Sequence, residues 1–260
     1  MKDKPAQVAE LLRDAECLMS DYLAKTGDLN HEAKGIRRSE MFFFYASVAH
    51  LQPTGIIESG RARAQSTLVL SRLFQGAAIV SLESDAASPD VEVAAERLRG
   101  CHNVECRFGD SLRLLPEIVR PGDVVLIDGP KDFRALRLAF RLLRGNGAAM
   151  VFVHDLWLGS PARRFVDRHL PSVLLSDESA WVERYSSLDS GRPAPAATVG
   201  SPRRAYGATF GRFERGACNY HLLDLSCRFA QGRDRLGENG RKFAGRPSLV
   251  RPRDFESPGT

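Results

Sequence analysis

The chain has 260 residues, of which 43% are hydrophobic and 27% are charged, and its formal net charge is +5. These values are ordinary for a soluble globular protein, and a chain of this length buries enough apolar surface to fold without disulfide bonds or a structural metal. The five cysteines form no CxxC pair, which argues against a zinc cluster. No run of about 18 apolar residues predicts a transmembrane helix.

Arginine supplies most of the positive charge, because only six of the 37 basic residues are lysines. The arginines are scattered along the sequence, and neither a helix-turn-helix nor an RNA-binding aromatic motif accompanies them. We therefore expect no nucleic-acid partner, although the pI of about 9.1 permits one. The first residues are charged throughout and lack the apolar core of a signal peptide, so the expected location is the cytoplasm.

Two helices are predicted at the start of the chain. Apolar residues recur at helical spacing over 5–25, and a second helix over 30–51 ends before Pro53 and Gly55. We treat residues 1–52 as an N-terminal helical unit that packs on the main domain or closes over its pocket. Its aromatic run, Phe42 to Phe44, favours core packing, and a contact between two copies of the chain, a homodimer, stays open.

Short apolar segments alternate with amphipathic ones between residues 55 and 155. The pattern predicts strands at 55–59, 77–84, 103–110, 122–129 and 148–156, and helices at 66–74, 90–100, 111–119 and 132–147. Nearly continuous apolar strands joined by helices are typical of a parallel sheet covered on both faces. Right-handed crossovers then give a doubly wound, Rossmann-like α/β fold.

The pattern is weaker after residue 156. It predicts a helix at 160–170, a sixth strand at 171–178, a loop at 189–204 and a seventh strand at 205–215, antiparallel to the sixth. The main domain would then span 53–215, with a mostly parallel seven-stranded sheet, helices on both faces and an antiparallel last strand. Residues 216–260 form a C-terminal extension, and its low apolar content predicts a mobile tail from about residue 230.

Polar or acidic groups follow five successive predicted strands. They are Glu58 with Gly60, Glu83, the segment Gly109-Asp110-Ser111, Asp128, and His154 with Asp155. Ligands of open parallel sheets bind at the carboxyl ends of the strands, so these groups predict one site. Gly60 lets the backbone approach a ligand closely, and Glu83 is placed to accept hydrogen bonds from ribose hydroxyls. Asp110 and Ser111 contact a nucleoside or cap the next helix.

With these residues, the segment from about 50 to 215 resembles class I S-adenosylmethionine-dependent methyltransferases. The resemblance is closest to the metal-dependent O-methyltransferases of the catechol and caffeoyl-CoA type. It implies that six residues bind the cofactor: Glu58, Gly60 and Ser66 for the methionine part, Glu83 for the ribose, and Asp110 and Ser111 beside the adenine. Two glycines of the family's first turn are replaced by Ala62 and Ala64.

The most specific match is Asp128-Gly-Pro-Lys131-Asp132, followed by Asp155. The resemblance implies that Asp128 and Asp155 bind a divalent cation such as Mg²⁺ and that Lys131 is the base. Hard cations prefer carboxylate oxygens, and a bound cation lowers the pKa of an acceptor hydroxyl. A lysine whose own pKa is depressed by burial and by the cation then takes the proton, and the oxyanion attacks the sulfonium methyl group.

Four further residues depart from the family pattern. Leu156 stands where the family has a third metal ligand, and His154 offers an alternative base or a partner to the metal ligands. Lys131, Asp128 and His154 are therefore the candidate catalytic residues. Arg61 and Arg63 in the first turn point to solvent or hold an anionic acceptor.

The sequence thus predicts an S-adenosylmethionine-dependent methyltransferase that acts on a hydroxyl of a small molecule or a sugar, with a divalent cation as a second cofactor. Two other interpretations stay open. One is a non-catalytic or regulatory nucleotide-binding relative, and the other is an arginine-rich nucleic-acid-binding protein. Trp157 and Trp181 are candidates for the acceptor pocket or for packing.

Overall fold

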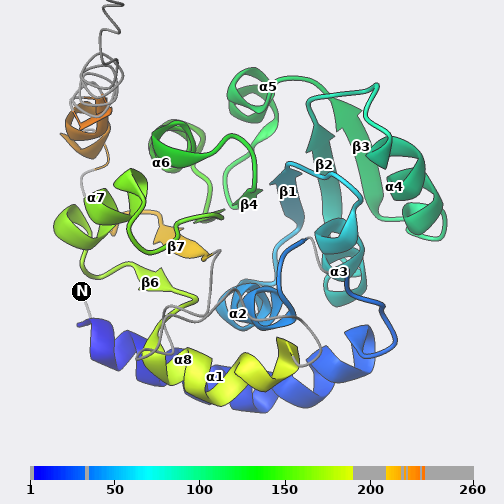
Figure 1. The fold of residues 1–260 in the computed structure, drawn as a ribbon, viewed down its shortest axis with the longest axis horizontal. Coiled ribbons are helices and arrows are strands. Elements are labelled where there is room, and N and C mark those ends of the chain that lie inside the picture. The colour runs from blue at the N-terminus through cyan, green and yellow to red at the C-terminus, as the bar shows by residue number, and fades with distance from the viewer. Residues whose placement is uncertain are drawn as a thin grey trace, which may run out of the picture.

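A computed structural model describes residues 3–32, 35–189, 209–217, 220, 222–228 and 230–231. Its centre is a seven-stranded sheet with the strand order β3-β2-β1-β4-β5-β7-β6 (Figure 1). The strands are β1 (Gly55–Ser59), β2 (Ala78–Glu83), β3 (Val104–Phe108), β4 (Val124–Ile127), β5 (Met150–Val153), β6 (Leu174–Leu175) and β7 (Gly211–Glu214). The first five pair in parallel, and β7 is antiparallel to both β5 and β6. The predicted Rossmann-like sheet with an antiparallel last strand is confirmed.

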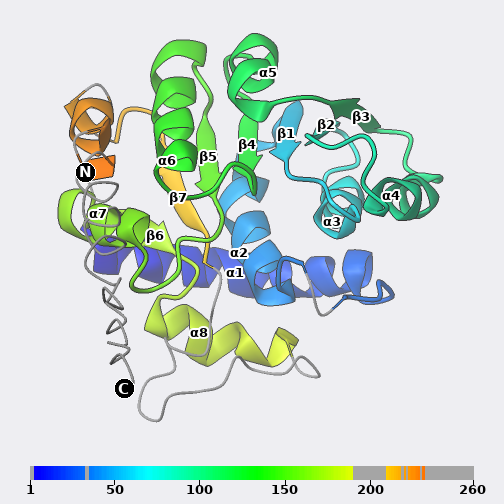
Figure 2. The same cartoon turned by 45° about the horizontal axis from the view of Figure 1, so that its top comes forward.

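Helices cover both faces of the sheet (Figure 2). One face is covered by α1 (Lys4–Thr26), α2 (Arg38–Val48), α3 (Gln65–Leu73) and α8 (Ser179–Tyr185), with α4 (Asp90–Leu98) beside α3. The other face is covered by α5 (Ser111–Ile118), α6 (Asp132–Arg141), its continuation η2 (Leu142–Asn146) and α7 (Pro161–His169). Two short turns of helix, η1 (Ala49–Leu51) and η3 (Ser186–Asp189), follow α2 and α8.

Side-chain caps begin several of these helices. The Asp3 carboxylate accepts a hydrogen bond from the Ala6 N–H at 3.0 Å at the start of α1. Ser160 does the same for the Arg163 N–H at 3.1 Å at the start of α7, where Pro161 follows it. Such caps satisfy N–H groups that have no partner within the helix. Proline at the first helical position costs no hydrogen bond, because an N–H at that position has no partner within the helix.

The N-terminal helices are part of the core. Phe42, Phe43 and Phe44 of α2 have no exposed surface. The Phe44 and Phe43 rings lie 4.5 Å and 6.4 Å from the ring of Phe152 on β5, and Phe43 also contacts Trp181. The core-packing prediction for the aromatic run is confirmed, and Trp181 is a core residue too. In contrast, Trp157 is 53% exposed.

The second half of the chain differs from the prediction in detail. The predicted strand 171–178 shortens to Leu174–Leu175, and α8 follows it without having been predicted. The predicted loop 189–204, residues 205–208 of the predicted seventh strand and the predicted tail after residue 231 lie outside the described residues. In the part of the chain that the structure describes, we find no helix long and apolar enough to cross a membrane.

Candidate active site

The turn after β1 lies directly against the loop after β4. Gly60 has a φ of +87°, and a Cβ there would lie 2.9 Å from the carbonyl carbon of Asp128 and 3.0 Å from the Gly129 nitrogen. Those distances exclude any side chain, so glycine is required at position 60. The Ser59 hydroxyl donates a hydrogen bond to the Gly129 carbonyl and adds a second link. The predicted cofactor turn and the predicted metal-binding loop therefore share one backbone contact.

The two alanines that replace glycines keep a backbone that favours glycine. Ala62 has a φ of +43° and Ala64 a φ of +59°, both in the left-handed region. This region costs residues with a Cβ about 1–2 kcal/mol each. Ala64 is fully buried and packs with Ala94 and Leu98 of α4. The turn thus retains its shape at a cost in backbone strain.

Glu58 is buried beneath this turn. Its carboxylate accepts hydrogen bonds from the hydroxyls of Thr67 and Ser81, the latter at 2.8 Å, and it has no exposed surface. Burial raises the pKa of Glu58 above its usual value, although these hydrogen bonds favour the charged form. Ser66, at the start of α3, is also buried. The structure therefore places Glu58 under the first turn, where it connects β1, β2 and α3.

Glu83 joins the end of β2 to the first turn. Its Oε2 accepts a hydrogen bond from the Ala62 N–H at 2.8 Å, and its Oε1 accepts from the N–H groups of Ser84 at 2.7 Å and Asp85 at 3.3 Å. Burial opposes ionisation of Glu83, but these backbone hydrogen bonds outweigh it and lower the pKa of the carboxyl. Glu83 is therefore a carboxylate at neutral pH, as a ribose-binding acid has to be.

The segment after β3 contains a helix cap. Asp110 accepts a hydrogen bond from the Leu112 N–H at 2.9 Å and so caps α5, as one of the two predicted roles requires. Ser111 is buried at the first position of that helix. Phe108, the last residue of β3, is 45% exposed beside them. An aromatic ring at this strand end offers a flat apolar surface for a planar group.

The two arginines of the first turn have different surroundings. Arg61 is 3% exposed, donates from Nη1 to the Ser81 carbonyl at 2.8 Å, and lies 4.9 Å from the centre of the Phe108 ring. The predicted solvent exposure of Arg61 was wrong, because the carbonyl groups of Ser81 and Arg107 hold the guanidinium inside, and its predicted role in acceptor binding stays a prediction. Arg63 is half-exposed and pairs with Glu32 at 2.8 Å.

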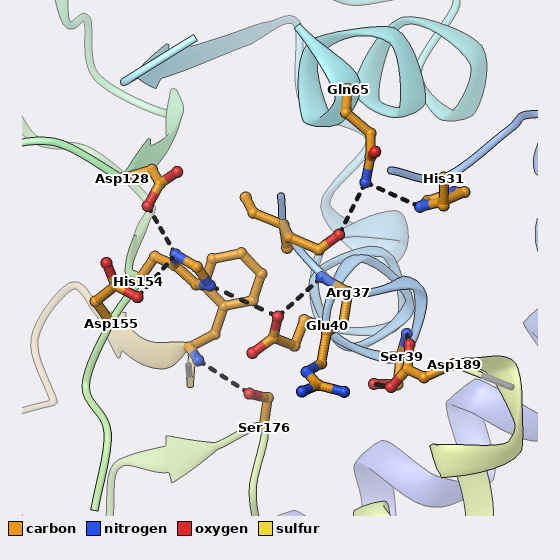
Figure 3. Close-up of polar contacts among 12 residues, drawn as sticks. His31, Arg37, Ser39, Glu40, Gln65, Asp128, His154, Asp155, Ser176 and Asp189 are labelled. Carbon is orange, nitrogen blue, oxygen red and sulfur yellow. Dashed lines mark hydrogen bonds and ion pairs between the residues drawn. The ribbon is translucent and has the colours of Figure 1, made fainter. Parts of the chain in front are cut away.

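The four predicted residues of the reaction centre come together at the ends of β4 and β5. The Lys131 Nζ lies 2.5 Å from Asp128 Oδ1 and 2.5 Å from Asp155 Oδ2. The His154 Nδ1 lies 2.7 Å from the same Asp128 oxygen (Figure 3). Asp155 adopts a φ of +61°, which turns its carboxylate back toward the cluster. These contacts define a charged cluster made of Asp128, Lys131, His154 and Asp155.

Sequence reasoning missed one member of this site, Glu40 on α2. Its carboxylate is 1% exposed, and its Oε2 lies 3.6 Å from the His154 Nε2 on the side away from Asp128 (Figure 3). The same oxygen accepts a hydrogen bond from the Arg37 N–H at 2.9 Å. Glu40 is the single acidic residue in a helix that is otherwise mostly apolar, and that position was the available signal.

Buried charges control the electrostatics of the cluster. Burial lowers the pKa of His154, but Asp128 and Glu40 outweigh it and raise that pKa to about 10. Burial also opposes the charged form of Lys131, yet Asp128 and Asp155 raise its pKa. The depressed pKa expected of Lys131 as a base is therefore wrong for the ligand-free chain. Two cations instead offset the three carboxylates of the site.

Asp128, His154 and Asp155 also form a candidate metal site. One ligand atom from each lies within 4.8 Å of the others. Leu156 is buried in the core, so the imidazole of His154 offers the third donor of this candidate site. A set of two carboxylates and one imidazole suits Mn²⁺, Fe²⁺ or Zn²⁺ better than Mg²⁺. The donor set fits such an ion once the Lys131 ammonium withdraws from the two aspartates and the His154 imidazole loses a proton.

The chain matches no protein-family model and no curated protein sequence. In fold it is similar to the O-methyltransferase from Bacillus cereus solved in complex with SAH, at 18% identity over 78% of this chain and 90% of that one, with a TM-score of 0.45. It is also similar to the O-methyltransferase TomG from Streptomyces achromogenes, solved with SAM, at 19% identity over 80% and 90%, with a TM-score of 0.46. An rRNA methylase from Streptococcus thermophilus is similar at 10% identity over 68% and 96%, with a TM-score of 0.45.

Proposed function

We propose that the chain is an S-adenosylmethionine-dependent methyltransferase that methylates a hydroxyl oxygen of a small molecule or a sugar. The observation that carries this proposal is the backbone contact between Gly60 and Asp128. It joins a turn suited to the cofactor and a charged cluster suited to deprotonating an acceptor. Holding both reactants at one edge of the sheet accounts for a large part of the rate of such a reaction.

The proposed cofactor residues lie on three strand ends. Glu83 accepts hydrogen bonds from the ribose hydroxyls, the start of α3 at Ser66 receives the carboxylate, and Asp110 with Ser111 borders the adenine. Glu58 acts from below by holding the first turn. Bound S-adenosylmethionine supplies the electrophilic methyl group on its sulfonium.

The charged cluster removes the proton from the acceptor hydroxyl. The Lys131 ammonium orients the acceptor oxygen, and after it has lost a proton to solvent its Nζ takes the hydroxyl proton. A divalent cation bound beside Lys131 would favour that loss, because repulsion between like charges lowers the pKa of a lysine. His154 holds Asp128 in place. Asp128, His154 and Asp155 are the residues that would hold a divalent cation, which would lower the pKa of the acceptor hydroxyl.

One observation favours a second candidate, binding of the cofactor without transfer. Lys131 is paired with both aspartates and has a raised pKa, which opposes a base role. A cofactor-binding relative without activity would keep Glu83 and the first turn and show no turnover. A cytoplasmic location and a homodimer stay predictions of the sequence.

Calorimetric titration with S-adenosylhomocysteine tests the proposed cofactor site. The wild type is expected to bind in the micromolar range, and Glu83→Gln is expected to bind at least 10-fold more weakly, because it loses a charged acceptor. Glu92→Gln, an exposed change on α4, is the matched control and should bind like the wild type. Absence of wild-type binding at millimolar ligand would contradict the proposal.

A transfer assay separates the two candidates. Radiolabelled S-adenosylmethionine is incubated with catechols, phenols and sugars in the presence and absence of Mn²⁺ and Mg²⁺. Label in an acceptor, abolished by Asp128→Asn, supports the methyltransferase. Binding of the cofactor without transfer to any acceptor supports the second candidate.

A further inference from the structure

The outward face of α6 carries a row of arginines. Arg134, Arg137, Arg141 and Arg144 are spaced by three, four and three residues, so their side chains share one side of the helix. At 1.5 Å per residue the row is about 15 Å long. Arg134, Arg141 and Arg144 are exposed, and Arg137 is partly buried. The helical period thus places these four nearby arginines along one side.

A groove of about 500 Å³ runs along this row. In both views α6 lies between α5 and the helical residues 222–228, which are drawn in orange (Figures 1 and 2). The far wall of the groove contributes Arg228 and Asp224. We call this feature the arginine groove and define it by six residues, Arg134, Arg137, Arg141, Arg144, Asp224 and Arg228.

The arginine groove has a large excess of positive charge. Asp224 is its one acidic lining residue among those described, and it lies 3.2 Å from the Arg137 Nε and 2.8 Å from the Arg228 Nη2. The same carboxylate therefore serves two guanidinium groups and ties α6 to the residues after β7. Five guanidinium groups and one carboxylate stand among the described lining residues, so positive charge predominates there. Such an excess favours an anionic ligand.

We propose that the arginine groove binds the phosphate backbone of a nucleic acid. One planar guanidinium group donates two parallel hydrogen bonds to two oxygens of a phosphate. A linear row of such groups fits a chain of regularly spaced phosphates. The described lining offers only Leu112 and Leu138 as apolar contacts and no aromatic ring. It thus lacks the apolar pockets that hold an amphipathic peptide helix and the rings on which bases stack. Binding through phosphates alone is independent of base sequence.

This site is separate from the charged cluster and does not depend on the proposed methyl transfer. The row starts one turn after Lys131, which is the residue before α6, and continues along the helix away from the charged cluster. A bound strand would therefore lie along the outer face of α6. The expectation of no nucleic-acid partner overlooked this spacing, and the sequence does not show that Arg228 lines the same groove.

Fluorescence anisotropy with a labelled 20-base-pair DNA duplex and a labelled 20-nucleotide RNA tests the proposal. Four phosphate contacts predict a slope of about −3.6 for the logarithm of the duplex binding constant against the logarithm of salt concentration. Affinity should then fall on the order of 100-fold between 50 and 200 mM KCl. The double variant Arg134→Glu, Arg141→Glu should lose at least 10-fold at 50 mM and have a shallower slope.

The matched control is the double variant Arg13→Glu, Arg72→Glu, which makes the same charge change on α1 and α3, over the opposite face of the sheet. All four positions are exposed, so circular dichroism should show both variants folded. Equal losses in the two variants, or no wild-type binding at 50 mM KCl, would overturn the proposal. Stronger groove-dependent binding to phosphatidylserine vesicles or polyglutamate than to either nucleic acid would also overturn it. Retained binding of S-adenosylhomocysteine by the groove variant keeps this result distinct from the proposed function.

Discussion

The carboxylate of Glu40 and the imidazole of His154 face one another inside the protein, with 3.6 Å between Oε2 and Nε2. They come from α2 and from the residue that follows β5, so the N-terminal helices contribute a charge to the proposed active site. Since Asp128 lies on the other side of the imidazole, His154 is held between two carboxylates. Its ring also packs 4.9 Å from the ring of Phe210. The imidazole of His154 is thus fixed in place and positions the Asp128 carboxylate.

Glu40→Gln is expected to lower kcat on the order of 10-fold and to leave KM and cofactor affinity within about 2-fold, because it removes a charge that positions His154 without touching substrate. The glutamine keeps an oxygen for the Arg37 N–H. Steady-state kinetics and calorimetry measure both effects. Asp189→Asn, which weakens the hydrogen bonds to Ser39 at the start of α2, controls for loosening of the helix. An equal loss of kcat in that variant would contradict a role through His154.

Ala62→Gly is expected to stabilise the protein by about 0.5–1 kcal/mol, because relief of the left-handed strain exceeds the added entropy of the unfolded chain. Ala95→Gly is the control, since Ala95 is also exposed but lies inside α4, where glycine costs about 1 kcal/mol. Urea unfolding of both variants should therefore give changes of opposite sign. Destabilisation of both by similar amounts would exclude strain at Ala62.

Glu58→Gln and Glu83→Gln are expected to change the pH dependence of stability in opposite directions. The folded-state pKa of Glu58 is raised, so wild-type stability falls as pH rises from the unfolded pKa of about 4.3 through the folded value. The Glu58→Gln substitution should therefore raise the free energy of unfolding most at high pH. The folded-state pKa of Glu83 is lowered, so its stabilisation is present above about pH 4.3 and disappears as pH falls through the folded value. Urea unfolding at pH 3.5, 5 and 8 tests both directions.

Asp177→Ala is expected to destabilise the protein by about 3–5 kcal/mol, because it leaves the buried Arg163 guanidinium without its main partner. Arg163 is 3% and Asp177 1% exposed, and two hydrogen bonds of 2.9 and 3.2 Å join them. Arg163 also donates to the Leu156 carbonyl at 3.0 Å, so the loop after Asp155 should loosen as well.

Two variants check the cause of that loss. The double variant Arg163→Met, Asp177→Leu should recover most of the stability, because apolar side chains of similar volume fill the space. Asp28→Ala, which removes an exposed pair with Arg72 at 3.7 Å, should cost less than about 1 kcal/mol. Urea unfolding measures all three. In Asp177→Ala the guanidinium keeps Asp167 at 2.9 Å, which is about half-exposed. A double variant as unstable as Asp177→Ala would mean that packing, and not the loss of the buried ion pair, dominates.

Lys131→Met is expected to raise the affinity for Mn²⁺ at least 10-fold and to abolish transfer, because the ammonium that occupies the two aspartates is removed together with the proposed base. Calorimetric titration with MnCl₂ measures the first effect and the transfer assay the second. Lys4→Met, which removes an equally close ion pair with Glu178, should change neither. Unchanged Mn²⁺ affinity would show that the aspartates bind no cation in competition with Lys131.

The parallel half of the fold could be predicted from the sequence because apolar runs and amphipathic periods report burial directly. The sixth strand was predicted at 171–178 but has only two residues, and α8 was not predicted, since so short a strand and a seven-residue helix depend on their neighbours. The helix α8 is held by the packing of Trp181 against Phe42 and Phe43. The strand-end acids could be predicted for the same reason as the strands. Glu40 and Arg61 could not be placed, because their partners come from other elements and meet them only in the folded chain.

The helix α2 belongs both to the core and to the proposed active site. Its aromatic side chains fill the space against β5, while Glu40, two residues before that run, lies against His154. A substitution on α2 that changes the surroundings of Glu40 therefore also disturbs the packing of the sheet. We expect that variants with new acceptor preferences arise here only together with compensating changes in the core, and that loops such as 156–160 are the freer route to new specificity.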